Sequence, residues 1–443
     1  MARKLRLKIN GFISLLAFSS ILLFTPVISF ASVSLSQSDT LISKVESIKG
    51  ISDVKSLESR HFNQKYTLFI DQPLDHDNPA AGKFRQRVFV MNIAQDRPTV
   101  IVTEGYGAGY VVNPAYREEI SRLLDANIVF VEHRFFLAST PDDKNWKYLT
   151  AKNSAYDLHN VRKAFGDLYK GKWIATGISK GGQTALLYRA FFPNDVDITV
   201  PYVAPLCRGV EDGRHEPFLS KKAGTPQERA LLYEFQREVL KRRAELQPKF
   251  DSLCEVKKYK FNIPLDEVYD FSVLEFPFAF WQWGSPVAEV PARGSSADVI
   301  FKYWMKISSP DYFVSETPVT PFFVQAGREL GYYGYDIKPF KGLLRLKKSK
   351  GYLDRIFIPD GAKTKFDKGL YRKLKRFVAT TDKKIMFIYG EFDPWSAVMV
   401  NEPKKENVVL FIEPKGSHRA RISTLPEEMK KEAVDILNNW LSQ

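Results

Sequence analysis

Residues 176–182 read Thr-Gly-Ile-Ser-Lys-Gly-Gly and stand between a short apolar segment and a helical pattern. A Gly-x-Ser-x-Gly sequence in that setting is typical of a sharp turn that lifts a nucleophilic serine above a sheet. Side chains at Gly177 and Gly181 would collide with the neighbouring strand or helix. The stretch therefore predicts Ser179 as a nucleophile, with the Lys180 backbone N–H facing a developing oxyanion. The alternative is an ordinary glycine-rich helix entry.

Strand-like and helical segments alternate on both sides of this turn. The expected strands are short and apolar, at 99–103, 128–132, 173–176, 198–203, 384–389 and 408–412. The expected helices lie at 114–124, 154–168, 181–192 and 426–441. Such alternation indicates a parallel sheet covered on both faces. Two earlier strands, 64–72 and 84–94, read as an antiparallel hairpin. The prediction is an α/β chain with the α/β-hydrolase fold, mostly parallel, with an N-terminal antiparallel hairpin.

The alternation stops near Pro205 and resumes only at the strand expected from residue 384. The intervening chain is charged, aromatic and helical in pattern, with a long helix expected at 225–246. A sheet that is interrupted by helices and then completed suggests a catalytic domain with an inserted helical cap. The predicted parts are a signal peptide at 1–31, a catalytic domain at 32–205 and 383–443, and a cap at 206–382.

A serine nucleophile needs a base, and the base needs an acid that orients it. In this fold the acid and then the histidine follow the serine in the chain. His215 and His418 are the histidines after Ser179, and His418 lies between a strand and the last helix, where the base belongs. Asp393 follows the strand expected at 384–389. Glu391 is the rival carboxylate, but Pro394 fixes the backbone after Asp393, which favours Asp393.

The second oxyanion donor is expected in the loop after the strand at 99–103. That loop reads Glu104-Gly105-Tyr106-Gly107, and its glycines would allow the backbone to approach a substrate closely. The donor would be the backbone N–H or the phenol of Tyr106, next to Gly105. A plain glycine turn is the alternative.

The N-terminus has the layout of a secretory signal peptide. Basic residues are followed by an apolar run to Phe30, and Ser29 and Ala31 supply small residues for cleavage before Ser32. We expect a secreted or periplasmic protein without stable membrane insertion after cleavage; an uncleaved anchor is the alternative. The formal net charge is +14, but no nucleic-acid motif accompanies it. Cys207 and Cys254 could form a disulfide in an oxidising compartment, or remain two free buried thiols.

Five motifs in order resemble those of the bacterial prolyl tri/tetrapeptidyl aminopeptidases, which are secreted serine peptidases. They lie at 103–107, 131–136, 177–182, 391–396 and 416–419. That family is similar in turn to the Pro-X carboxypeptidase and dipeptidyl peptidase II group. The resemblance implies cleavage after proline near a free N-terminus, releasing short peptides, and a cap that restricts access. Ser179, Asp393 and His418 match the family's serine, aspartate and histidine.

The substrate implied by the resemblance suggests further site residues. A protonated α-amine would need a carboxylate, and the candidates are Glu104, Glu132, Glu275 and Glu329. A proline ring suits a pocket lined by aromatic rings, which Tyr332 or the run at 271–283, including Trp281, would supply. The alternative for that run is packing in the core of the cap.

The residues alone are also compatible with two other functions. An esterase or lipase would use the same three catalytic residues, although the charged cap disfavours lipids. A non-enzymatic envelope protein could have kept the fold, although Ser179, Asp393 and His418 stand in the required order. The expected partners are proline-containing peptides rather than nucleic acids. The serine mechanism is expected to need no metal and no organic cofactor.

Overall fold

The computed structural model describes residues 40–363 and 365–443. Every element below belongs to one compact unit, residues 42–443. The predicted signal peptide at 1–31 lies outside the described residues. In the part of the chain that is described, no helix has both the length and the apolar character needed to cross a membrane.

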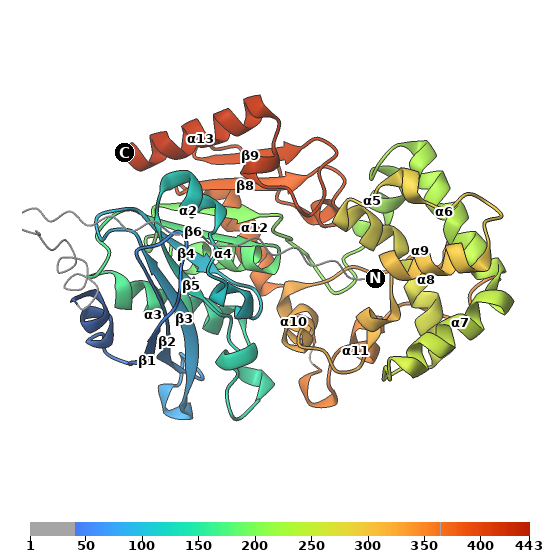
Figure 1. Ribbon diagram of the computed structural model, residues 1–443, viewed down its shortest axis with the longest axis horizontal. Coiled ribbons are helices and arrows are strands. Elements are labelled where there is room, and N and C mark those ends of the chain that lie inside the picture. The colour runs from blue at the N-terminus through green and yellow to red at the C-terminus, as the bar shows by residue number, and fades with distance from the viewer. Residues whose placement is uncertain (1–39, 364) are drawn as a thin grey trace, which may run out of the picture. The chain divides into compact units, whose positions relative to one another are not determined.

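Within these described residues, nine strands form one sheet in the order β1-β2-β3-β5-β4-β6-β7-β8-β9 (Figure 1). The strands are β1 (Ile51–Ser56), β2 (Gln64–Pro73), β3 (Lys83–Asn92), β4 (Thr99–Thr103), β5 (Asn127–Val131), β6 (Trp173–Ile178), β7 (Ile198–Tyr202), β8 (Lys384–Gly390) and β9 (Val408–Glu413). From β5 through β9 all neighbours are parallel. Strands β1, β2 and β3 pair antiparallel, as do β3 and β5.

This strand order, with helices on both faces, is the α/β-hydrolase fold, and the predicted fold class is confirmed. Strand β1 was not predicted, because it is short and largely exposed and lacks a run of apolar residues. The helix expected at 114–124 begins only at Glu119.

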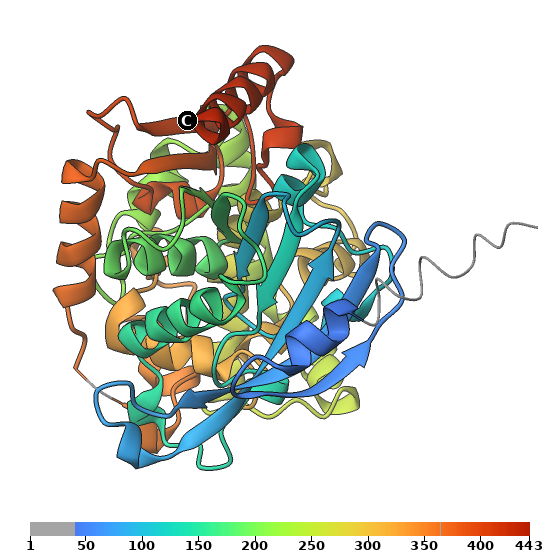
Figure 2. The ribbon, with the colours of Figure 1, turned by 90° about the vertical axis from the view of Figure 1, so that its left-hand side faces the viewer.

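Helices cover both faces of the sheet. On one face, α2 (Glu119–Leu124) and α13 (Glu427–Ser442) contribute Ile120, Leu437 and Trp440 to a core with β4 and β5. On the other face lie α3 (Ala151–Phe165), α4 (Lys180–Phe191) and α12 (Gly369–Thr380). Figure 2 shows α3 and α4, both green, beside the strands. Both faces of the central strands are therefore buried, as their continuous apolar sequences predicted.

Most remaining helices lie between β7 and β8 in the chain. They are α5 (His215–Lys221), α6 (Pro226–Lys241), α7 (Arg243–Val256), α8 (Leu265–Trp283), α9 (Ala297–Ile307), α10 (Thr320–Gln325) and α11 (Tyr352–Ile356). The long helix expected at 225–246 is two helices, because the backbone leaves helical geometry at Arg242 (φ −92°, ψ 23°). The predicted insertion at 206–382 also contains α12, which packs on α4.

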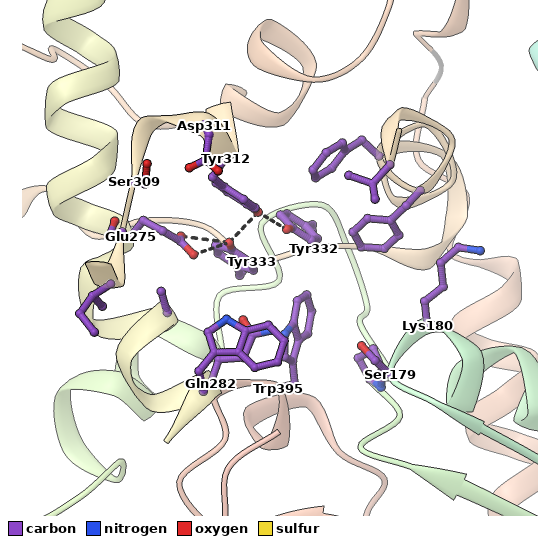
Figure 3. A pocket seen from close by; sticks show the side chains of 18 of the residues that line it. Ser179, Lys180, Glu275, Gln282, Ser309, Asp311, Tyr312, Tyr332, Tyr333 and Trp395 are labelled. Carbon is purple, nitrogen blue, oxygen red and sulfur yellow. Dashed lines mark hydrogen bonds between the residues drawn. The ribbon is translucent and has the colours of Figure 1, made fainter. Parts of the chain in front are cut away.

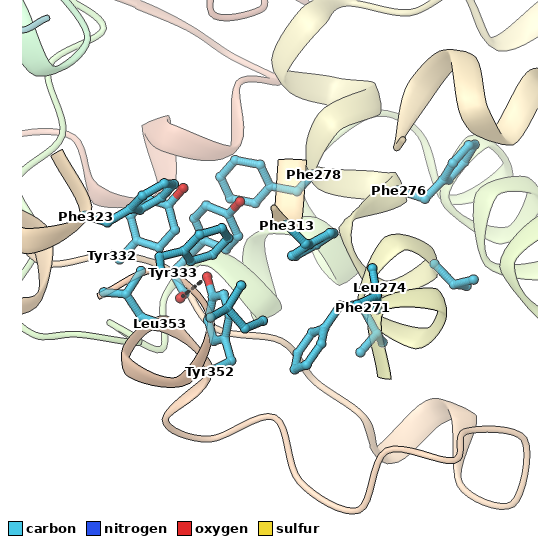
Figure 4. Packing of buried hydrophobic residues seen from close by; sticks show 14 of the residues in the cluster. Phe271, Leu274, Phe276, Phe278, Phe313, Phe323, Tyr332, Tyr333, Tyr352 and Leu353 are labelled. Carbon is cyan, nitrogen blue, oxygen red and sulfur yellow. Dashed lines mark hydrogen bonds between the residues drawn. The ribbon is translucent and has the colours of Figure 1, made fainter. Parts of the chain in front are cut away.

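The inserted helices enclose a largely aromatic core (Figure 4). The same cluster also includes Phe135, Tyr148 and Trp395 from outside the insertion. The rings of Phe278 and Tyr333 stack with their centroids 3.8 Å apart, and those of Tyr332 and Tyr333 with theirs 4.3 Å apart. Phe271 and Phe276 are fully buried in the same cluster. Most of the aromatic run at 271–283 therefore packs in the core of the insertion.

The two cysteines are free and buried, so the expected disulfide is not formed. Cys207 follows β7 and lies close against Gly331, whose φ is +79°. Cys254 lies on α7. Both side chains pack in apolar surroundings, and this burial raises the pKa of each thiol.

Candidate active site

The turn at Ser179 has the strained geometry that its sequence predicts. Ser179 lies between β6 and α4 with φ 57° and ψ −121°. A Cβ on Gly177 would stand 2.4 Å from the Gly181 carbonyl oxygen, and one on Gly181 would stand 2.7 Å from the Thr103 carbonyl oxygen. Real Cβ atoms do not approach backbone so closely, so both glycines are required. The backbone N–H of Ser179 donates to the Tyr202 carbonyl at 2.9 Å and holds the turn on β7.

His418 and Asp393 form a buried pair. Nδ1 of His418 is 2.6 Å from Oδ2 of Asp393, whose other oxygen accepts the Trp395 backbone N–H at 3.1 Å. Nε2 of His418 is buried and has no hydrogen-bond partner among the described residues. The rival carboxylate of Glu391 instead accepts the Lys415 backbone N–H at 2.7 Å. Because Nδ1 is hydrogen-bonded to Asp393, Nε2 is the nitrogen that could exchange a proton with a nucleophile.

The other histidine after Ser179, His215, is unsuited to act as a base. It is fully buried, and its ring lies 5.5–5.9 Å between centroids from the rings of Phe278, Tyr333 and Trp395. Burial lowers the pKa of His215 to about 3, so the ring is neutral at physiological pH.

The loop after β4 lies directly beside the turn. A Cβ on Gly105 would stand 2.6 Å from the Gly181 nitrogen, so glycine permits this close approach. The Tyr106 backbone N–H donates to Oε1 of Glu104 at 3.0 Å and is therefore engaged. Burial and the Glu104 charge raise the pKa of the Tyr106 phenol, while a hydrogen bond with the Ser179 side chain opposes that rise. The phenol, rather than the N–H, is the group of Tyr106 that reaches Ser179.

The side chain of Lys180 fastens this loop to the turn. Its Nζ donates to the Gly105 carbonyl at 2.6 Å and is buried against the rings of Tyr106 and Phe136. Burial lowers the pKa of Lys180 to about 7, although the charge of Glu104 opposes the shift. The Lys180 backbone N–H begins α4, where the first N–H groups of a helix have no partner within it.

A cavity of about 720 Å³ lies beside Ser179 (Figure 3). Ser179 stands at one side and Glu275 at the other, with Tyr332 and Tyr333 between them. Trp395 also lines the cavity, and its ring centroid lies 6.4 Å from that of His418. The cavity thus joins a nucleophile, aromatic walls and a carboxyl group.

Glu275 is buried in the wall of the cavity, on α8. Its carboxylate accepts the Tyr333 hydroxyl at 3.0 Å and the Tyr335 hydroxyl at 2.7 Å. Burial raises the pKa of Glu275 to about 8, and the two phenols oppose that rise only in part. At neutral pH this carboxyl group is therefore mostly protonated, and a cation beside it would favour the ionised form.

The other predicted carboxylates have internal partners and do not line this cavity. Glu132 is fully buried and accepts hydrogen bonds from the Arg87 side chain and, at 2.8 Å, from the Ala108 backbone N–H. Glu329 accepts the Ala151 backbone N–H at 2.5 Å, at the start of α3. The second oxygen of Glu104 accepts the Tyr110 hydroxyl at 2.6 Å. These contacts explain why the three carboxylates are directed elsewhere.

The aromatic residues of the cavity were predicted only in part. Tyr332 lines it as expected, whereas Trp281 lines a second cavity, between α5, α6 and α8. Trp283, the last residue of the run at 271–283, lines the first cavity as that run predicted, whereas Trp395 lines it but was not singled out from the sequence. The position of Trp395, two residues after Asp393, could have indicated it.

Helix α8 also touches the histidine loop. The Gln282 carbonyl accepts the His418 backbone N–H at 3.0 Å. The Trp283 ring lies edge-on to the His418 ring, with centroids 6.2 Å apart. The inserted helices are therefore joined to the candidate base by a backbone hydrogen bond.

Solved structures offer distant likenesses. A proline iminopeptidase from Mycobacterium smegmatis is 12% identical with a TM-score of 0.38, covering 84% of this chain and 98% of that one. VinJ is 10% identical with a TM-score of 0.36, covering 88% of this chain and 98% of that one. These likenesses are too distant to support an inference about function.

Comparisons of the sequence find relatives that are more similar to this chain. The "Prolyl tri/tetrapeptidyl aminopeptidase" of Streptomyces mobaraensis is 33% identical over 379 residues, covering 83% of this chain and 78% of that protein. The family model of PS-10 peptidase S37 matches residues 37–442. Both findings confirm the resemblance that the motifs indicated. The chain belongs to the PS-10 peptidase S37 family.

Proposed function

We propose that this peptidase cleaves after proline near the free N-terminus of peptides and releases short fragments through an acyl-enzyme on Ser179. The observation that carries the proposal is the shared cavity, with Ser179 at one side and the buried carboxyl group of Glu275 at the other. The name of the Streptomyces mobaraensis relative, which is 33% identical, supports the same substrate.

In the proposed mechanism, Oγ of Ser179 attacks the prolyl carbonyl carbon. Nε2 of His418 takes the serine proton and then gives it to the leaving amine, which breaks the peptide bond. Asp393 accepts Nδ1–H at 2.6 Å and stabilises the imidazolium that forms. Water activated by the neutral His418 then attacks the acyl-enzyme, and proton return from His418 to Ser179 completes the cycle.

Two donors would stabilise the oxyanion. One is the Lys180 backbone N–H at the start of α4, and the other is the Tyr106 phenol, which interacts with the Ser179 side chain. The pKa of that phenol is raised, so it stays protonated and can donate. Preorganised donors of this kind are worth about 3–4 kcal/mol each to the transition state.

Glu275 would bind the protonated α-amine of the substrate. A cation at that position compensates the desolvation of the carboxylate, so binding favours its ionised form. The Tyr333 hydroxyl already lies within hydrogen-bond distance of both carboxylate oxygens, and the Tyr335 hydroxyl donates to one of them. Trp395 and Tyr332, whose ring centroids lie 5.5 Å apart, would form aromatic walls for the proline ring.

The proposal also includes export. The basic start and apolar run within residues 1–31 have the layout expected of a signal peptide. N-terminal sequencing of the protein recovered outside the cytoplasm is expected to begin near Ser32. An intact Met1 on that protein would contradict cleavage.

Peptide anilides ending in proline test the function. The purified protein is expected to cleave free Xaa-Xaa-Pro anilides well and their N-acetylated forms poorly. Ser179→Ala is expected to abolish both activities while retaining the thermal transition of the unchanged protein. Cleavage of simple acyl esters without any cleavage of prolyl anilides would contradict the proposal and favour an ester hydrolase.

A further inference from the structure

The C-terminal end of α8 is fastened to the loop that carries the candidate base. The Gln282 carbonyl accepts the His418 backbone N–H at 3.0 Å. Gly284 ends the helix with a φ of 66°, and a Cβ on it would stand 3.2 Å from the Ser417 side chain. Trp283, the last residue of α8, is therefore held at a fixed place beside His418.

The His418 ring lies near two indole rings that differ in their surroundings. The Trp395 ring is buried, and its centroid lies 5.5 Å from those of Tyr332 and Tyr333. The Trp283 ring lies edge-on to His418 with centroids 6.2 Å apart, and Trp283 is 51% exposed although it lines the cavity. Trp283 therefore stands beside the base where the cavity opens to solvent.

The proposed reaction places the leaving part of the peptide at His418. Nε2 of His418 gives its proton to the nitrogen that follows the proline, which requires a separation of about 2.6–3.2 Å. The side chain of the residue after the proline starts two bonds beyond that nitrogen, so it lies close to the imidazole. The proline and the residues before it are directed instead toward Trp395 and Glu275. The open indole of Trp283 is thus available to the leaving side.

We propose that Trp283 forms the binding subsite for the residue that follows the cleaved proline, and that it favours an aromatic or large apolar side chain there. The inference rests on the proposed function, because His418 must protonate the leaving nitrogen. An aromatic side chain would cover the indole and remove apolar surface of both rings from water. Glycine would leave the indole exposed. The Arg419 guanidinium, 5.9 Å from the Trp283 ring centroid, steadies the ring through a cation–π contact.

Peptides that differ only after the proline test the subsite. They share the sequence Ala-Ala-Pro-Xaa-Ala-Ala, with a free N-terminus and an amidated C-terminus, and Xaa is phenylalanine, leucine or glycine. The measurement is kcat/KM, which reports the step in which the leaving part is still bound. For the unchanged protein it is expected to be about tenfold higher for phenylalanine than for glycine. Trp283→Ala is expected to remove this preference, whereas Trp283→Phe keeps most of it.

Two controls separate substrate binding from an effect on the base. Val256→Ala is the matched variant and should keep the preference, because Val256 is an exposed apolar residue on α7 that does not line the cavity. A fluorophosphonate probe carries no leaving peptide, so its rate of reaction with Ser179 reports the nucleophile and the base alone. Trp283→Ala is expected to react with it at the rate of the unchanged protein. If that variant is not labelled at all, Trp283→Leu takes its place.

Three results would overturn the subsite. The first is equal cleavage of the phenylalanine and glycine peptides by the unchanged protein. The second is a preference that persists in Trp283→Ala. The third is an equal loss on all peptides together with slow labelling of Ser179, which would make Trp283 a positioning residue for His418. Failure of the proposed function looks different: the unchanged protein would react with the probe but cleave none of the peptides, and the subsite would fall with it.

Discussion

Ser179 shows how a local sequence fixes a reactive geometry. Its positive φ of 57° costs about 1–3 kcal/mol for a residue with a side chain. The contacts at Gly177 and Gly181 leave the turn no room to relax. Ser179, Asp393 and His418 are predicted as catalytic residues because each follows a recognisable strand. Trp395 was not singled out, because aromatic residues make up 14% of the chain and no sequence pattern shows which of them line the cavity.

Asp393→Asn is expected to lower kcat by about 10⁴-fold, because an amide holds the histidine in the wrong tautomer. The comparison is Glu391→Gln, which loses only the hydrogen bond to the Lys415 N–H and is expected to stay within about twofold of the unchanged protein. Steady-state kinetics on one prolyl anilide measures both. Equal losses in the two variants would contradict the assignment of Asp393.

Lys180→Met is expected to lower kcat by about 10- to 100-fold with little change in KM, because the Gly105 carbonyl loses its Nζ donor and the oxyanion loop is released. The affinity for a peptidyl boronate, which mimics the tetrahedral state, should fall in parallel. Lys172→Met removes a lysine that pairs with Asp197 outside the cavity and should change neither value. A rise in KM alone would contradict this role.

Among the elements, the buried strands were predicted closely because continuous apolar runs admit few alternatives. The helix expected at 225–246 was wrong in its length: the capping box at Thr225 marks its start correctly, but no sequence signal marks the break at Arg242. The amine site was left open among four glutamates. Of these four, Glu275 is the one that lines the cavity beside Ser179, and the sequence does not show how α8 packs there.

The buried carboxyl group on α8 predicts a pH-dependent stability. The pKa of Glu275 is about 8 in the folded protein and near 4.5 when exposed. Between these values the folded state binds more protons than the unfolded state, so stability falls as pH rises. Glu275→Gln removes this dependence. The melting temperature of the variant minus that of the unchanged protein should therefore increase from pH 5 to pH 8. A constant difference over that interval would contradict the raised pKa.

The cavity is assembled from segments that are far apart in the chain. Tyr106 comes from the loop after β4, Glu275 from α8, Tyr332 from the chain after α10, and Trp395 from the chain after β8. Sequence patterns predicted the sheet and the inserted helices but not which of their faces meet. The substrate-binding residues therefore depend on how the inserted helices pack against the sheet.

A ten-residue peptide with proline at position three tests the central claim most directly, with products identified by mass spectrometry. The account predicts a single cut after the proline that persists when the C-terminus is amidated and is lost when the N-terminus is acetylated. Ser179→Ala should leave the peptide intact. A cut that depends on a free C-terminus, or no cut by protein whose Ser179 reacts with a fluorophosphonate, would contradict the account.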